Sequence, residues 1–102
     1  QREQKVRNVI TKEGSRATSP RRKEIEKAEE FIMESETQIA KYHQELVEAS
    51  NTNDSSKVME LSQLVSKLET EVEERFERME AAQTELDALM AEYEVRLTAL
   101  EG

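Results

Sequence analysis

The chain has 102 residues, of which 4% are aromatic and 35% hydrophobic, so it is one domain at most and is too lean for a thick globular core. It has no cysteine, which excludes a disulfide framework and a thiol site. No apolar run approaches the ~20 residues of a membrane span and no signal peptide is evident, so we expect a cytoplasmic protein without a membrane partner. The start at Gln1 instead of Met suggests a piece of a larger protein.

The net charge of −8 hides a division along the chain. Residues 1–23 carry eight basic and two acidic residues, whereas residues 24–102 carry seven basic and twenty-one acidic residues. A basic segment on an acidic chain points to a polyanionic partner for that segment.

Residues 1–19 combine basic side chains with glycine, serine and threonine, a composition that predicts a flexible basic arm. Within this arm Val6, Val9 and Ile10 have the spacing of one apolar face of a short helix. Ser19-Pro20 then resembles a helix start, with Ser19 as the N-cap and Pro20 at the first helical position.

A first helix is predicted over residues 20–49, because apolar residues recur there at heptad spacing. The a positions are Ile25, Ile32, Ile39 and Leu46, and the d positions are Ala28, Ser35, Tyr42 and Ala49. The polar stretch 50–56 (SNTNDSS) predicts a turn, in which Asn51 or Asn53 adopts a left-handed conformation and Asp54 or Ser55 caps the next helix. Such a short connection makes the two helices antiparallel neighbours.

The second helix is predicted over residues 57–101, where six heptads share one seam without proline or glycine before Gly102. Its a positions are Val58, Val65, Val72, Met79, Leu86, Tyr93 and Leu100, and its d positions are Leu61, Leu68, Arg75, Ala82, Leu89 and Arg96. The fold class that follows is all-α. It is an antiparallel two-helix coiled-coil hairpin over residues 20–102, with a long second helix and a flexible basic N-terminal arm.

Folding the chain at this turn pairs residues whose numbers sum to about 107, such as Ile39 with Leu68. Each such pair sets an a position against a d position, as antiparallel knobs-into-holes packing requires. Arg75 falls opposite Ile32, and we expect its guanidinium to extend outward toward a glutamate as a register-fixing residue.

The second helix is longer than the first, so its last residues would be bare unless the arm folds back over them. An uncovered apolar patch usually marks an interface. The alternative function is therefore a protein–protein interaction or weak self-association, through these four residues: Leu89, Tyr93, Leu97 and Leu100.

Catalytic and metal-binding constellations are missing from the sequence. The chain has two glycines, so it has no glycine-rich phosphate loop, and the single His43 has no cysteine or second histidine with which to hold a metal. Paired carboxylates such as Glu73–Glu74 lie on a solvated helix face without a pocket. We expect no enzyme, no cofactor and no metal site in this chain.

The basic segment offers mobile cations of the kind that contact phosphates without reading bases. The residues expected to bind nucleic acid lead into the first helix: Arg16, Arg21, Arg22 and Lys23, with Lys12 and Arg7. The competing interpretation is a solubilising linker.

Residues 20–82 also resemble a known type of domain. The stretches EIEKAEEFI and IAKYHQEL, a polar turn, and SKVMELSQLVSKLETEVEERFERME are similar to the C-terminal coiled-coil domain of ABC-F ATPases of the Uup type. Met79 stands where that family usually has tryptophan, and the second helix continues past the family's usual end. The resemblance implies a parent with two ATP-binding cassettes, which hold ATP and magnesium, and an accessory domain that contacts DNA or ribosomal RNA.

Overall fold

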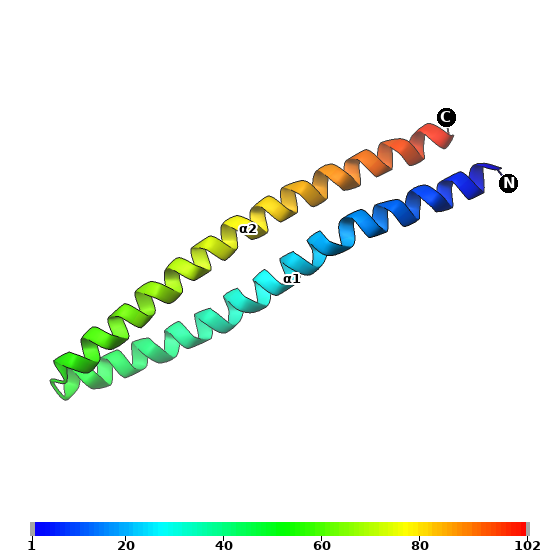
Figure 1. Cartoon of the computed structure of the whole chain (residues 1–102). Coiled ribbons are helices and arrows are strands. Elements are labelled where there is room, and N and C mark those ends of the chain that lie inside the picture. The colour runs from blue at the N-terminus through cyan, green and yellow to red at the C-terminus, as the bar shows by residue number, and fades with distance from the viewer. Residues whose placement is uncertain (1, 102) are drawn as a thin grey trace. The chain divides into compact units, whose positions relative to one another are not determined.

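The computed structural model describes residues 2–101, which form two α-helices joined by a short turn (Figure 1). Helix α1 spans Arg2–Asn51 and helix α2 spans Ser55–Glu101. The described residues contain no strand, so the predicted all-α helical hairpin is confirmed. Gln1 of the predicted arm and Gly102 of the predicted hairpin lie outside the described residues.

The hairpin divides into two compact units, each containing part of both helices. The terminal unit contains residues 2–27 and 79–101, and the turn unit contains Ala28–Arg78. In the terminal unit the start of α1 lies beside the end of α2 (Figure 1).

The turn between the helices follows from three residues. Asn53 has a φ of 57°, in the left-handed region that asparagine tolerates better than most residues. The amide of Asp54 donates to the carbonyl of Ala49 at 2.9 Å, which ends α1 in a Schellman-type cap. The carboxylate of Asp54 then accepts from the amide of Lys57 at 3.2 Å and caps α2. The predicted left-handed residue and cap are therefore found, in a turn that is shorter than the predicted 50–56.

The register of the helix pair matches the prediction in each unit. In the turn unit the guanidinium carbon of Arg75 lies 4.6 Å from the ring centroid of Phe31. In the terminal unit Arg21 Nε bonds Glu85 at 3.0 Å and Arg96 bonds Glu13 at 3.1 Å. The residue numbers of these pairs sum to 106, 106 and 109, close to the expected 107.

The prediction of a flexible arm over residues 1–19 was wrong for residues 2–19, because these residues lie in α1. The prediction that the first helix begins at Pro20 was also wrong. The d positions of the first helix continue backwards through Arg21, Gly14 and Arg7, all of which are half-buried, although the preceding a positions Thr11 and Gln4 are exposed. Packing against α2 therefore holds this segment helical, although its glycine and proline are poor helix formers.

Pro20 lies inside α1, where its lack of an N–H leaves the carbonyl of Arg16 without its usual amide donor. Two side chains bond carbonyls of the preceding turns. The Thr18 hydroxyl donates to the carbonyl of Gly14 at 2.8 Å, and Arg21 Nη1 donates to the carbonyl of Ala17 at 3.0 Å. Both bonds satisfy backbone carbonyls close to the point where the helical pattern is interrupted.

The core is a narrow seam in each unit. Its buried residues in the terminal unit are Ile10, Thr18, Ala82 and Leu86. Those in the turn unit are Ala28, Ile32, Ser35, Ala49, Leu61 and Val65. Many are small, and alanine or serine on one helix leaves room for a larger side chain on the other.

Candidate nucleic-acid interface

The first 26 described residues of α1 present two different faces. The face toward α2 contains the buried Ile10 and Thr18, with Gly14 between them. At about 100° per residue, the side chains of Lys5, Lys12 and Arg16 point about 180° away from that face. This opposite side of α1 is called the outer face below.

Two of the predicted binding residues face α2 and not solvent. Arg7 is half-buried and interacts within the structure. Arg21 is also half-buried, and its guanidinium bonds both Glu85 and the carbonyl of Ala17. Arg22 is exposed but lies on the flank of the helix, where its Nη2 is 3.5 Å from the sulfur of Met90. These three arginines do not join the outer face.

The other three predicted residues do share the outer face. Lys12, Arg16 and Lys23 are exposed and project within about 40° of one another around the helix. Sequence reasoning missed two further members, Lys5 and Lys27, which are also exposed and extend the same row. We call these five residues the basic row.

The basic row is uninterrupted by acidic residues. The four glutamates among residues 2–27 all point outside the sector of about 60° that the row occupies. From Lys5 to Lys27 the row extends about 33 Å at 1.5 Å per residue. Within the described part of the chain, no ion pair or side-chain hydrogen bond involves any of the five. Their charges are therefore directed at solvent.

The two helices of the terminal unit carry opposite net charges. Residues 1–27 carry nine basic and four acidic residues, and residues 79–102 carry one basic and six acidic residues. The unit thus has a helix of charge +5 beside a helix of charge −5. The turn unit, residues 28–78, carries five basic and thirteen acidic residues. A polyanion therefore meets an attractive surface at α1 of the terminal unit and a repulsive one at α2.

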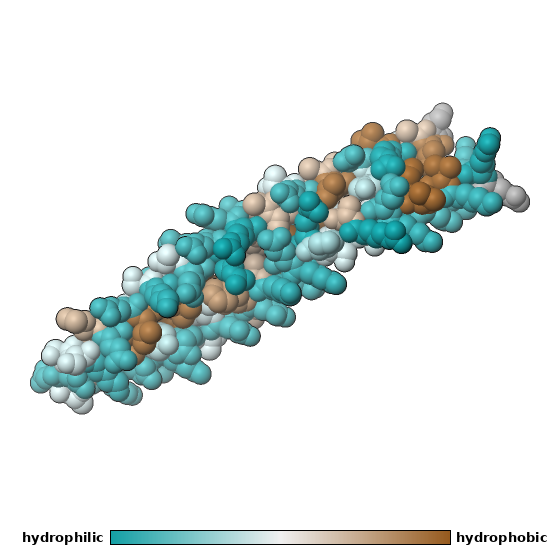
Figure 2. Space-filling model, in the orientation of Figure 1, coloured by the Kyte–Doolittle hydropathy of each residue, from teal (hydrophilic) through white to brown (hydrophobic). Residues whose placement is uncertain are grey.

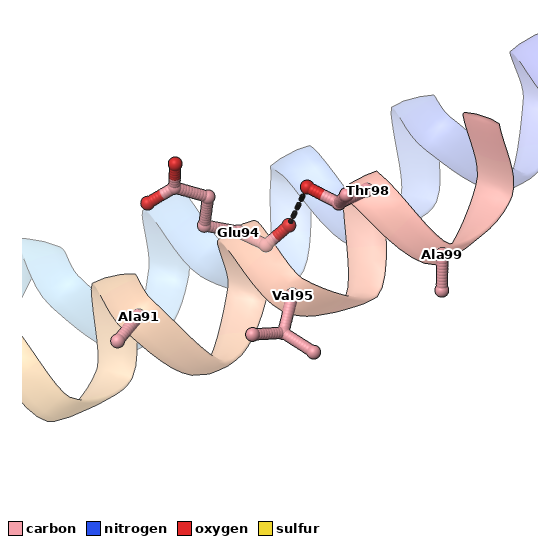
Figure 3. Close-up of a pocket in the computed structure, with 5 residues that line it drawn as sticks. All are labelled: Ala91, Glu94, Val95, Thr98 and Ala99. Carbon is pink, nitrogen blue, oxygen red and sulfur yellow. Dashed lines mark hydrogen bonds between the residues drawn. The ribbon is translucent and has the colours of Figure 1, made fainter. Parts of the chain in front are cut away.

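A shallow groove of about 520 Å³ lies on α2 of the terminal unit (Figure 3). Ala91, Val95 and Ala99 line it with Thr98 and Glu94, and the Thr98 hydroxyl donates to the carbonyl of Glu94 at 2.9 Å. Its only charged lining residue is a carboxylate, so this groove does not suit a phosphate.

A second groove of the terminal unit, of about 480 Å³, runs between α1 and α2. Gly14, Tyr93 and Leu97 are among the residues that line it, with Arg22 from α1 and Glu94 from α2. Because this groove has a positive and a negative side chain, it lacks the purely positive surface that a polyanion site requires.

The alternative interface is largely covered in the structure. Leu89, Tyr93, Leu97 and Leu100 are all half-buried. The ring of Tyr93 lies against Gly14 of α1, and Tyr93 and Leu97 line a groove together with residues of α1 before Pro20. Of the three apolar residues with the spacing of a helix face in the predicted arm, Ile10 is buried whereas Val6 and Val9 are 42% and 55% exposed. Of the two outcomes that the sequence left open, a bare end of the second helix or one covered by the preceding segment, the structure shows the covered one. Figure 2 shows an apolar, brown area on the visible face of this unit, near the chain ends.

Catalytic and metal-binding arrangements are not seen among residues 2–101. No group of three or more histidine or acidic side chains is placed to hold a metal ion in this range. Neither helix, over the same residues, has the length and hydrophobicity needed to cross a membrane.

Comparison with known proteins adds no family. No protein-family model matches the chain, and no curated protein or solved structure matches it either.

Proposed function

We propose that this chain is a helical-hairpin module that binds nucleic acid through the basic row of α1. The row itself is the observation that carries the proposal: five exposed cations on one side of one helix, about 33 Å long, without an acidic residue among them. Lysine and arginine at loose spacing neutralise phosphates and release counterions, which is the main source of sequence-independent affinity.

The proposed site differs from the six residues that the sequence predicted to bind nucleic acid. Lys12, Arg16 and Lys23 belong to both sets, and the proposed site adds Lys5 and Lys27. It excludes the arginines that face α2 or lie on the flank of α1. Binding is therefore expected along the side of α1, with the acidic α2 turned away from the ligand.

We also propose that this chain is part of a larger ATP-binding protein. The resemblance of residues 20–82 to the C-terminal coiled coil of ABC-F ATPases supports an accessory role beside two ATP-binding cassettes, with DNA or ribosomal RNA as the ligand. The test is the sequence of the full-length protein that contains this segment. Two cassettes with phosphate-binding loops would support this part of the proposal, and any other domain would contradict it.

The binding proposal is tested by neutralising the row. The variant carries four substitutions: Lys12→Gln, Arg16→Gln, Lys23→Gln and Lys27→Gln. A matched control removes four exposed cations of the turn unit: Lys41→Gln, Lys57→Gln, Lys67→Gln and Arg78→Gln. Glutamine keeps the helix propensity in both sets, so circular dichroism should show unchanged helix content.

The readout is the affinity for a short DNA duplex as the salt concentration changes. With five phosphate contacts, the affinity of the unmodified chain should fall roughly 10²–10³-fold between about 50 and 200 mM salt. The row variant should lose most of this binding and the control variant should keep it. Binding that ignores salt, or that both variants lose equally, would contradict the proposal, and the first result would favour protein–protein docking.

A further inference from the structure

We infer that the ligand of the basic row is a double-stranded nucleic acid held by both of its phosphate backbones. This inference rests on the proposed function and concerns the same residues. It follows from the spacing of the cations, from the position of the terminal unit's aromatic side chain and from the charge of α2.

The cations of the row are grouped in doublets. Lys12 and Arg16 are four residues apart, and Lys23 and Lys27 repeat this pair eleven residues later. Eleven residues are about three turns of helix, so the two doublets point in nearly the same direction, about 16.5 Å apart. Lys5 lies eleven residues before Arg16 and continues the repeat.

A rigid helix with charge groups at a fixed separation suits a ligand with two rows of charge. A duplex presents phosphates on both edges of each groove, and the major groove of B-DNA is about 12 Å wide. Lysine and arginine side chains are long and flexible enough to bridge the remaining few ångströms. One doublet can therefore meet each backbone when α1 crosses a groove.

A single strand finds less to bind here. Proteins that hold single strands stack the bases on aromatic side chains, and each stacked base contributes about 1–3 kcal/mol. Residues 1–27 contain no aromatic residue, and residues 79–102 contain one, Tyr93. Its ring lies against Gly14 on α1 and under the guanidinium of Arg96, whose central carbon is 5.1 Å from the ring centroid. The terminal unit therefore offers charge without a stacking surface.

The acidic α2 also favours a stiff ligand. A flexible strand gains contacts by wrapping around its site, but wrapping here would bring phosphates to the six acidic residues of 79–102. A duplex touches the outer face of α1 from one side and keeps its other phosphates away from α2. Its backbone carries no sequence information, so the expected binding is independent of base sequence.

The test compares four ligands of equal length: a DNA duplex, an RNA duplex, and one single strand of each. The unmodified chain is compared with the doublet variants Lys12→Gln/Arg16→Gln and Lys23→Gln/Lys27→Gln. The control Lys41→Gln/Lys67→Gln removes the same charge from the turn unit. Circular dichroism establishes that each variant keeps its helix content.

At least one duplex is expected to bind tenfold or more tightly than its single strand. Each doublet variant should reduce the slope of log affinity against log salt by about 1.8 on the DNA duplex, and the control should leave it unchanged. Equal or tighter binding of single strands that the doublet variants still weaken would overturn the duplex inference and leave the proposed function standing. An effect of one doublet alone would also overturn it. Absence of binding to all four ligands would overturn both.

Discussion

The ring of Tyr93 on α2 lies directly against Gly14 on α1: a Cβ atom built on Gly14 would be 3.2 Å from Cγ of Tyr93. This contact lies in the terminal unit. The numbers of the two residues sum to 107, as expected for residues paired across the seam. Glycine destabilises a helix interior relative to alanine, but here the absence of a side chain leaves room for the tyrosine ring.

The contact predicts a specific coupling between Gly14 and Tyr93. Gly14→Ala should gain about 0.5–1 kcal/mol of helix stability when Tyr93 is also changed to alanine. In the presence of Tyr93 the gain should be smaller, since the new methyl group pushes the ring from its position. Chemical denaturation of the four proteins in the cycle measures the difference. Asn8→Ala, at an exposed site away from Tyr93, should combine additively with Tyr93→Ala. Additivity at Gly14 as well would contradict the contact.

Pro20 distinguishes a continuous α1 from a helix that begins at this residue. Inside a helix proline is about 3 kcal/mol less favourable than alanine, so Pro20→Ala should raise both helix content and melting temperature. At the first position of a helix proline is well suited, and the same change would then bring no gain. Thermal melts by circular dichroism decide between these outcomes, and an unchanged or lower melting temperature would contradict the continuous helix.

Asn53 predicts a different response at the turn. Its φ of 57° favours asparagine or glycine, so Asn53→Gly should keep the stability, whereas Asn53→Ala should lose about 1 kcal/mol. Asn51→Ala, in the last residue of α1, is the matched control and should change the stability little. Equal stability of the glycine and alanine variants at residue 53 would be inconsistent with the left-handed conformation.

The turn and the register could be predicted because their signals are local and repeated. Asn53 and Asp54 fall at positions where few residue types end one helix and start the next. The heptads of both helices fix their pairing once the turn is placed, and the contacts of Phe31 with Arg75 and of Gly14 with Tyr93 agree with that pairing.

The start of α1 could not be predicted from the same signals. Its glycine and proline resemble those of a loop, and the heptad continues through Arg7 and Gly14 in polar or small residues that a search for apolar residues overlooks. Tertiary packing against Tyr93 and Leu97 overrides the local preferences.

The proposed binding residues overlap only in part with those predicted from the sequence, because charge alone does not show which way a side chain points. Lys12 and Arg16 carry the same charge as Arg7 and Arg21, but the helix turns the first two to solvent and the last two toward α2. Arg75 shows the same limit, since its guanidinium lies over the ring of Phe31 and forms no ion pair with a glutamate among the described residues.

The most direct test of the central claim moves the charges around α1 without changing the composition. Exchanging Thr11 with Lys12 and Ser15 with Arg16 gives the variant Thr11→Lys/Lys12→Thr/Ser15→Arg/Arg16→Ser. Residues 11 and 15 are exposed, and each points about 100° away from the cation with which it is exchanged, outside the basic row. Net charge and residue content stay the same, so a flexible arm or a purely nonspecific attraction would not distinguish the two chains.

The measurement is duplex affinity as a function of salt for the unmodified and exchanged chains. A basic row on a helical α1 predicts weaker binding by the exchanged chain and a salt slope lower by about 1.8, the loss of two phosphate contacts. Identical affinities and slopes, with helix content unchanged by circular dichroism, would contradict a binding site defined by one face of α1.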